Sequence, residues 1–308
     1  MCGRFASARK RMELLEEFGV QCDRVDDELE PDYNVAPTKP VYAVLTRRSD
    51  PSGDSASAGD SASAGDSASA GESVPAGHDA PRPADLVERQ LRVVRWGLVP
   101  WWAKDPAIGS RLINARAETV TEKPAFRRAF ARRRCLLPAD GFYEWQQVTE
   151  NGRKRKQPYY IYRADGGVLA FAGLYELWRD SSVPSDHAGG WLWTATIITT
   201  QATDEVGQIH DRMPMVIKPS AWQDWLDPGN TEVADLRELL LPAVSGGLTS
   251  HPVSTAVNNV RNNGPELVDL LPDAASDSGS PNPPLPRSGP SGAHPPDGAP
   301  AGSGGTLF

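Results

Sequence analysis

The second residue of the chain is a cysteine, Cys2, within the opening sequence M-C-G-R-F. Initiator methionine is normally removed when the next side chain is small, so we expect the mature chain to begin with Cys2. Its free α-amine and thiol would form a 1,2-aminothiol, which can take an aldehyde as an imine and close through sulfur to a thiazolidine. Ordinary pKa values of about 8 and about 8.5 leave part of each group reactive at neutral pH. Position alone equally fits a terminus without function.

Three polar residues lie in segments that are otherwise apolar or rich in Gly and Pro: Asn114 in I-N-A-R-A-E-T, Glu144 in A-D-G-F-Y-E-W and His210 in I-H-D-R-M-P. A carboxylate among aromatic side chains tends to a raised pKa and can move protons near neutrality. Each residue also has a structural interpretation. Glu144 could alternate outward on a strand, and His210 could belong to a hydrogen-bonded turn.

Adjacent tryptophans follow a proline in R-W-G-L-V-P-W-W-A, as Trp101 and Trp102. Neighbouring side chains of a strand point to opposite faces, so the two cannot both enter one core. We therefore expect at least one to be exposed. Exposed aromatic rings beside arginines are typical of single-stranded nucleic-acid binding, because the rings stack on bases and the cations hold phosphates. Asn34, in Y-N-V-A-P-T, fits a turn or a satisfied buried amide as well as a binding residue.

Positive charge gathers in two runs, K-P-A-F-R-R-A-F-A-R-R-R at residues 123–134 and R-K-R-K at residues 153–156. The chain has a formal net charge of −8, but residues 49–85 and 273–308 carry all of it, which leaves the remainder neutral. A neutral domain with segregated cations can bind a polyanion, although solvated faces and hairpin tips give the same pattern.

Two stretches lack the apolar residues that a core needs. Residues 49–85 contain three copies of G-D-S-A-S-A, and residues 273–308 are mainly Pro, Gly, Ser and Ala. Neither can bury enough surface to offset the entropy of ordering, so both are predicted to be disordered. The prediction is one domain at residues 1–272, with a disordered insert at 49–85, and a disordered tail at 273–308.

The cysteines and the sequence motifs indicate the cellular compartment and whether a metal or cofactor is expected. The three cysteines, Cys2, Cys22 and Cys135, have no paired spacing, which favours a reducing cytoplasm over a disulfide framework. We find no leader, no apolar stretch long enough for a membrane and no metal or nucleotide motif. A cytoplasmic protein without metal or cofactor is therefore expected.

Hydrophobic patterning predicts many short strands and few helices. Helices are expected at residues 7–18, 123–130, 220–226 and 232–240, and strands at 41–46, 91–94, 135–138, 142–147, 159–162, 168–174 and 191–199. The insert would then be an enlarged hairpin loop, which costs little closure entropy. The predicted fold class is α+β, a single domain of antiparallel sheets, barrel-like, with peripheral helices.

Seven motifs in order carry a resemblance to a known family: M-C-G-R-F, Y-N-V-A-P, R-W-G-L-V-P-W-W, I-N-A-R-A-E-T, C-L-L-P-A-D-G-F-Y-E-W, I-H-D-R-M-P and H-P-V-S-x-x-V-N-N-V. Together they closely resemble the SOS response-associated peptidase (SRAP) family, from residue 1 to about 268 apart from the insert. The long insert and the tail depart from the compact family pattern.

The resemblance implies recognition of abasic sites in single-stranded DNA during the DNA damage response, with a covalent thiazolidine crosslink through Cys2. By position, Asn114, Glu144 and His210 would complete the catalytic site. The residues that resemble the family's DNA contacts are Arg4, Asn34, Pro37, Trp101, Trp102, Arg116 and Arg212. The resemblance also implies a monomer without membrane contact, with the replication machinery as a candidate partner and association with the nucleoid on damage.

Two alternatives of other classes stay open. The first is an amide-hydrolysing nucleophile, in which the Cys2 amine acts as base and Asn114 with backbone N–H groups stabilises an oxyanion. The family name implies such a lyase- or peptidase-type, autoproteolytic site, with removal of residues before Cys2 as its peptidase act. The second is a non-covalent reader of single strands, which would bind intact and abasic strands equally and weaken steeply with salt.

Overall fold

The computed structural model describes residues 2–48, 87–150, 152–184, 190–240 and 247–272. All of them belong to one compact unit, Met1–Asp277. The two segments for which disorder is predicted, 49–85 and 273–308, lie outside the described residues.

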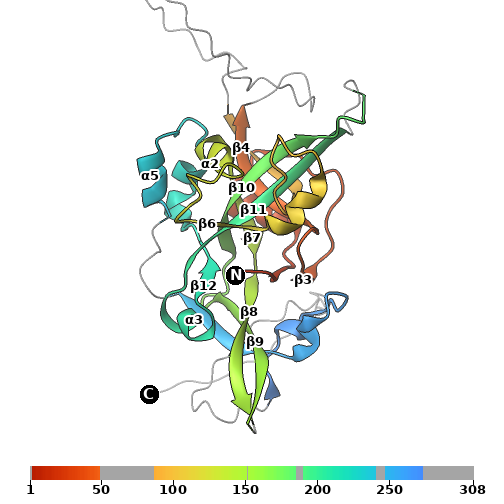
Figure 1. The fold of residues 1–308 in the computed structure, drawn as a ribbon, viewed down its shortest axis with the longest axis vertical. Coiled ribbons are helices and arrows are strands. Elements are labelled where there is room, and N and C mark those ends of the chain that lie inside the picture. The colour runs from red at the N-terminus through yellow and green to blue at the C-terminus, as the bar shows by residue number, and fades with distance from the viewer. Residues whose placement is uncertain (1, 49–86, 151, 185–189, 241–246, 273–308) are drawn as a thin grey trace, which may run out of the picture. The chain divides into compact units, whose positions relative to one another are not determined.

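Strands dominate the described part of the chain (Figure 1). They are β1 (Phe5–Ser7), β2 (Cys22–Asp23), β3 (Asp32–Val35), β4 (Pro40–Arg48), β5 (Val87–Trp96), β6 (Asn114–Arg116), β7 (Arg134–Ala139), β8 (Gly141–Glu150), β9 (Arg153–Arg163), β10 (Leu169–Arg179), β11 (Trp191–Gln201), β12 (Arg212–Pro214) and β13 (Leu248–Pro252). The α-helices are short: α1 (Arg11–Glu17), α2 (Arg127–Arg132), α3 (Asp204–Ile209), α4 (Trp222–Leu226) and α5 (Val233–Glu238).

Five strands close into a barrel. Antiparallel ladders join β5 to β4, β4 to β7, β7 to β10 and β10 to β11. A parallel contact between β11 and β5, with Thr194 opposite Arg95, completes the ring. Closure leaves these five strands without a free edge over the paired length. β6 and β12 both pair with the C-terminal half of β11 and continue the sheet beyond the barrel.

A second sheet has the strand order β13-β9-β8-β1-β3. Its centre is the long β8–β9 hairpin, which projects below the barrel in the view of Figure 1. β1 pairs with β8 through Phe5 and Phe142 and with β3 through Phe5 and Val35. The N-terminal strand β1 is therefore flanked by strands on both sides, although it is only three residues long.

The barrel interior is filled with aromatic and branched side chains. Phe5 packs edge-on against Trp96 and Phe171, at ring-centroid distances of 5.0 Å and 5.8 Å. A second cluster lies between the barrel and the helices, where Phe18 of the α1 C-cap stacks on Trp222 of α4 at 4.5 Å. Burial of rings of this size is worth about 2 to 3 kcal/mol each, so these contacts fix the helices against the sheet.

The predicted α+β class with antiparallel, barrel-like sheets is confirmed, and so is the hairpin across the insert, since Arg48 pairs with Val87. The helix predicted for residues 7–18 is wrong at its start. Ser7 belongs to β1 and the helix begins at Arg11, because Ala6 and Ser7 are taken up by ladders to β8 and β3. Helix α2 likewise begins at Arg127 rather than at residue 123.

One cation of the run at residues 123–134 is part of the core. Arg134 is buried and donates to five backbone carbonyls, among them those of Phe130, Trp225 and Asp227. Burial lowers the pKa of its guanidinium to about 10. Arg133 pairs with the buried carboxylate of Glu176 at 2.7 Å. The guanidinium groups of these two arginines are therefore engaged within the protein.

Candidate active site

Cys2 is fully buried, with 0% of its surface exposed, in the same hydrophobic cluster as Phe5, Trp96 and Phe171. The Asn114 Nδ2 atom donates to its carbonyl oxygen at 2.7 Å. Asn114 is the first residue of β6 and stands opposite Ile197 of β11, so the barrel wall fixes its position. All three cysteines are free thiols, as the sequence predicts.

The environment of the Cys2 thiol favours its neutral form. Burial raises its pKa well above the ordinary value, and the negative charge of Glu144 adds to the effect. The backbone N–H of Arg4 opposes it by hydrogen bonding to the sulfur. An ammonium group on Cys2 itself, as in a chain without Met1, would lie a few bonds from the sulfur and would favour the thiolate further.

Sheet register brings Glu144 to Cys2. Phe5 pairs with Phe142, and the Tyr143 backbone N–H donates to the Arg4 carbonyl at 3.0 Å, so the chain before Arg4 runs beside Glu144. The Glu144 side chain is 3% exposed, and burial raises its pKa to about 7. This carboxyl group is consequently half-ionised at neutral pH and can both accept and donate a proton.

His210 faces Glu144 from the loop that follows α3. Its Nε2 atom lies 3.9 Å from Glu144 Oε2. His210 Nδ1 lies 3.0 Å from the Arg212 backbone N–H, 3.0 Å from Asp211 Oδ1 and 3.2 Å from the Arg212 carbonyl oxygen, so this nitrogen has a partner whether or not it carries the proton. Burial lowers the pKa of the imidazole, so the neutral ring dominates at pH 7. His210 therefore takes part in local hydrogen bonds and also faces Glu144, so its structural and catalytic interpretations do not exclude each other.

Asn114 has a second polar atom at the site. Its Oδ1 atom is buried and has no hydrogen-bond partner among the described residues. A buried amide oxygen without a donor costs about 1 to 3 kcal/mol, a cost tolerated chiefly at functional sites. The atom is available to a donor such as an amine on Cys2 or a substrate hydroxyl.

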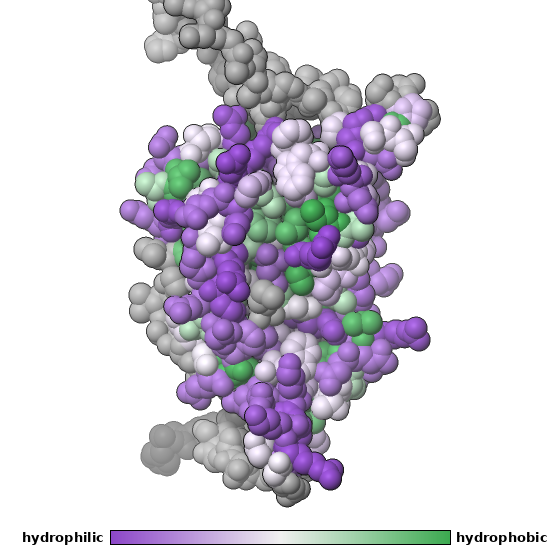
Figure 2. Space-filling view, in the orientation of Figure 1, coloured by the Kyte–Doolittle hydropathy of each residue, from purple (hydrophilic) through white to green (hydrophobic). Residues whose placement is uncertain are grey.

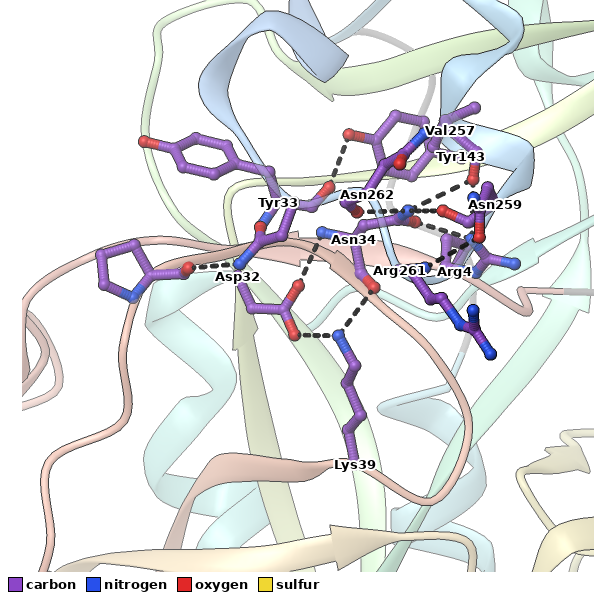
Figure 3. Close-up of polar contacts among 12 residues, drawn as sticks. Arg4, Asp32, Tyr33, Asn34, Lys39, Tyr143, Val257, Asn259, Arg261 and Asn262 are labelled. Atoms are coloured by element: carbon purple, nitrogen blue, oxygen red, sulfur yellow. Dashed lines mark hydrogen bonds and ion pairs between the residues drawn. The ribbon is translucent and has the colours of Figure 1, made fainter.

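Arg4 and Asn34 tie the N-terminal strand to a distant segment near the C-terminal end of the described chain (Figure 3). Arg4 Nη1 donates to Asn34 Oδ1 at 2.7 Å and to the Val257 carbonyl at 2.8 Å. Asn34 is 0% exposed, and its Nδ2 atom lies within 3.2 Å of the carbonyls of Val257, Asn259 and Asn262. Asn34 therefore holds residues 257–262 against Arg4, an arrangement in which its side chain does not face solvent.

The Arg4 guanidinium is half-buried and desolvation lowers its pKa. Its Nε atom is buried without a hydrogen-bond partner among the described residues. Its Nη1 atom donates to neutral oxygens, and the Trp145 ring lies under the group at 5.9 Å. A half-buried cation held by neutral groups keeps its affinity for an anion such as a phosphate.

Two further predicted phosphate contacts meet around Thr199. Arg116 of β6 pairs with Thr199 of β11, and Arg212 of β12 donates to the Thr199 carbonyl at 2.7 Å. Arg212 also makes a bidentate ion pair with Glu118, at 2.6 Å and 3.0 Å. Arg116 is exposed. An incoming phosphate would therefore meet Arg116 first and would compete with Glu118 for Arg212.

Trp101 and Trp102 are both exposed, at 56% and 48%. This agrees with the prediction that at least one of them is. The Arg128 guanidinium lies over the Trp101 ring at 5.3 Å. Pro37 is partly exposed and precedes Thr38, whose backbone N–H donates to the Trp96 carbonyl. A contact of these three predicted residues with DNA stays a prediction.

Sequence reasoning missed Glu118 as the ion-pair partner of Arg212 and Asn259 as an acceptor for Asn34. Both lie within motifs already singled out, I-N-A-R-A-E-T and V-N-N-V. Their roles depend on contacts between segments more than 90 residues apart, so position in a motif was the available signal.

The described residues contain no group of three or more His, Cys, Asp or Glu side chains that could hold a metal ion. Among the same residues, no helix is long and apolar enough to cross a membrane.

Comparison with known proteins found a family model and individual proteins whose sequences match this chain. The family model for SOS response associated peptidase (SRAP) matches residues 1–260. The abasic site processing protein YoaM of Bacillus subtilis (strain 168) is 36% identical over 269 residues, which cover 87% of this chain and 98% of YoaM. The abasic site processing protein HMCES of Xenopus tropicalis is 36% identical over 212 residues, covering 62% of this chain and 60% of HMCES.

Solved structures share the fold. A protein from Bacteroides thetaiotaomicron superposes with a TM-score of 0.63 at 23% identity, covering 88% of this chain and all of that one. A protein from Bordetella bronchiseptica gives a TM-score of 0.54 at 24% identity over 82% of this chain. At these identities the likeness concerns the fold alone.

Proposed function

Because the chain belongs to the SOS response associated peptidase (SRAP) family, we propose that it processes abasic sites in single-stranded DNA by bonding covalently to them through Cys2. Relatives named abasic site processing proteins support the lesion as substrate. The observation that carries the chemistry is the convergence of Asn114 and Glu144 on the first residues of the chain. Removal of Met1 is part of the proposal.

The covalent step balances without a cofactor. The abasic deoxyribose opens to an aldehyde, and the Cys2 nitrogen attacks the carbonyl carbon and loses water to give an imine. The thiol then adds across the C=N bond, so that sulfur bonds to carbon and the proton of the thiol reaches nitrogen. The product is a thiazolidine, and one water molecule leaves for each adduct formed.

Glu144 moves protons in this sequence. With a pKa of about 7 it accepts a proton from the Cys2 ammonium, protonates the departing hydroxyl and takes the thiol proton. His210, 3.9 Å away and neutral at pH 7, assists opening of the sugar. Asn114 Oδ1 accepts from the terminal amine and fixes its direction of attack.

DNA would be held by the arginines around the site. Arg4, Arg116 and Arg212 contact phosphates, and the exposed rings of Trp101 and Trp102 stack on bases next to the lesion. A strand that lacks one base bends there at less cost than intact DNA, because one stacking contact is already lost. In this arrangement Asn34 shapes the cleft indirectly, through Arg4 and residues 257–262.

Intact mass spectrometry of the purified protein tests the proposal, with and without a single-stranded oligonucleotide that carries one abasic site. We expect loss of Met1 and a covalent adduct that survives denaturant. Cys2→Ala should form none. Cys2→Ser keeps the amine and should give an imine that borohydride traps but that hydrolyses otherwise. Cys22→Ala is the matched control, a free and partly exposed cysteine whose loss should leave the adduct unchanged.

Three results would contradict the proposal. Adduct formation by Cys2→Ala at the wild-type rate would exclude Cys2 as the nucleophile. Turnover of generic peptides without DNA would favour the amide-hydrolase alternative. Equal binding of intact and abasic strands, with no covalent product, would favour a non-covalent reader.

A further inference from the structure

The β8–β9 hairpin carries a run of cations that the proposed chemistry leaves unused. Arg153, Lys154, Arg155 and Lys156 are four consecutive residues of β9, and all four are exposed. In the paired part of the hairpin beyond Gln146, Glu150 is the one acidic residue opposite them, and it pairs with Arg155. The hydrophilic surface at the lower end of the molecule in Figure 2 lies where this hairpin ends in Figure 1.

The hairpin leaves the body of the protein at a defined point. β1 pairs with β8 at Gly141 and Phe142, and β13 pairs with β9 from Tyr159 onward. Burial ends at the same level, since Gln157 is buried and Lys156 is exposed. From there outward the two strands pair with each other, and their outer edges carry no further described strand. We call residues 147–150 and 152–156 the basic arm.

The basic arm is a direct continuation of the candidate active site. Glu144 stands opposite Tyr159, and three residues further along β8 Gln147 stands opposite Lys156. At about 3.4 Å per residue, the arm runs from about 10 Å to about 20 Å beyond Glu144. Burial is the main cause of the low pKa of His210, and the charge of Lys156 contributes to it, so the base of the arm lies within electrostatic reach of the site.

Alternation places positive charge on both faces of the ribbon. Arg153 and Arg155 share one face, and Lys154 and Lys156 share the other. If the charges only prevented the strand edges from pairing with other strands, either sign of charge would serve. The charges of this arm are almost all positive. A rigid two-stranded ribbon of this kind fits a partner with closely spaced negative charges, such as the phosphates of DNA.

We propose that the basic arm binds the phosphate backbone of the DNA that flanks the lesion, outside the nucleotides held at the catalytic site. This inference rests on the proposed function for the position of the lesion. At its reach of about 10 to 20 Å it contacts phosphates about three to six positions away, at about 3.4 Å per position in duplex form. The arm supplies affinity and orientation and takes no part in the bond-forming steps.

The test uses Arg153→Gln combined with Lys154→Gln, which leaves Lys156 and the Arg155–Glu150 pair in place. The matched control is Lys10→Gln with Lys218→Gln, two exposed cations of other segments. Binding and adduct formation are measured with abasic oligonucleotides that have three or ten nucleotides on each side of the lesion, the longer ones with single-stranded or duplex flanks. Intact oligonucleotides of the same lengths report non-covalent binding.

We expect the wild type and the control to bind the long oligonucleotides more tightly than the short ones, and the arm variant to lose most of that gain. The slope of log K against log salt should fall by about 1.4 for single-stranded flanks or about 1.8 for duplex flanks. The flank that shows the loss identifies the form of DNA that the arm holds. Short oligonucleotides should react alike in all three proteins.

The proposal would be overturned if the DNA affinity of the arm variant depended on oligonucleotide length and on salt concentration in the same way as that of the control. It would also be overturned by an arm variant that aggregates more while its soluble fraction binds as the wild type does, because the cations would then protect strand edges. Failure of the proposed function gives a different result, namely no adduct with any oligonucleotide. Binding of intact DNA still decides the role of the arm in that case.

Discussion

The His210 Nε2 atom lies 3.9 Å from the Glu144 Oε2 atom, so two titratable groups with opposite pKa shifts share one site. Burial raises the pKa of the carboxyl group and lowers that of the imidazole, because it disfavours the charged form of each. At pH 7 the imidazole is consequently mostly neutral, and the carboxyl group is about half-ionised. A site of this kind can move a proton in either direction without creating a strong charge, which suits the formation and closure of an imine.

Glu144→Gln should slow adduct formation about 100-fold or more, since general acid–base catalysis typically contributes at least that factor. In the wild type the rate should rise as pH increases through about 7, where Glu144 ionises and can accept a proton from the Cys2 ammonium. The variant should lack this inflection. Single-turnover rates between pH 5.5 and 8.5 check the prediction, and Glu150→Gln, an exposed carboxylate of the same strand, should keep the inflection.

The same substitution should stabilise the fold at alkaline pH. The pKa of Glu144 is raised from 4.5 to about 7 in the folded state, so the native protein loses stability as pH rises between these values. Glu144→Gln removes this loss and should increase the free energy of unfolding by up to about 3 kcal/mol at pH 8, and little at pH 4.5. Urea denaturation at the two pH values measures the difference. If the variant were destabilised equally at the two pH values, burial would not raise the pKa of the Glu144 carboxyl group.

Asn34→Ala should cost about 2 to 4 kcal/mol of stability, because it leaves buried carbonyls and one Arg4 hydrogen bond without their partner. DNA affinity should fall as well, since Arg4 loses its support. The control is Val260→Ala, an exposed side chain of the same C-terminal segment, which should cost less than about 1 kcal/mol. Full stability of Asn34→Ala with weak DNA binding would instead indicate that Asn34 contacts DNA directly.

Glu118→Gln should tighten DNA binding about two- to fivefold at low salt, because a phosphate no longer competes with a carboxylate for Arg212. The gain is small because a partly exposed ion pair is worth about 1 kcal/mol or less. Fluorescence anisotropy with an intact single strand measures it. Glu122→Gln, an exposed acid nearby in the chain, is the control, and an equal gain in both variants would mean that only net charge matters.

Much of the fold could be predicted from the sequence, and the failures have local causes. Residues 41–46 and 91–94 read as strands because their apolar side chains suit a buried sheet, and they form the centres of β4 and β5. The prediction of a helix from residue 7 onward rests on the helical spacing of apolar residues such as Leu14 and Phe18. The ladders from Ala6 and Ser7 to other strands are non-local and override that preference.

The candidate residues of the site stand out in the sequence, whereas their spatial arrangement does not. Asn114, Glu144 and His210 stand out as polar residues in apolar or Gly/Pro-rich motifs, and Cys2 stands out by its position after Met1. Their convergence depends on the register of Phe5 with Phe142 and of Asn114 with Ile197, which no local pattern encodes. The same holds for Asn34 and Arg134. Both are buried and donate to backbone carbonyls of distant segments, which the sequence around them does not indicate.

The hydrogen bonds from Arg4 and Asn34 to Val257 have a consequence for biosynthesis. On the ribosome, the beginning of the chain emerges roughly 250 residues before the segment that locks it in place. Cys2 therefore becomes buried only after most of the chain has been synthesised, so the proposed removal of Met1 can precede its burial.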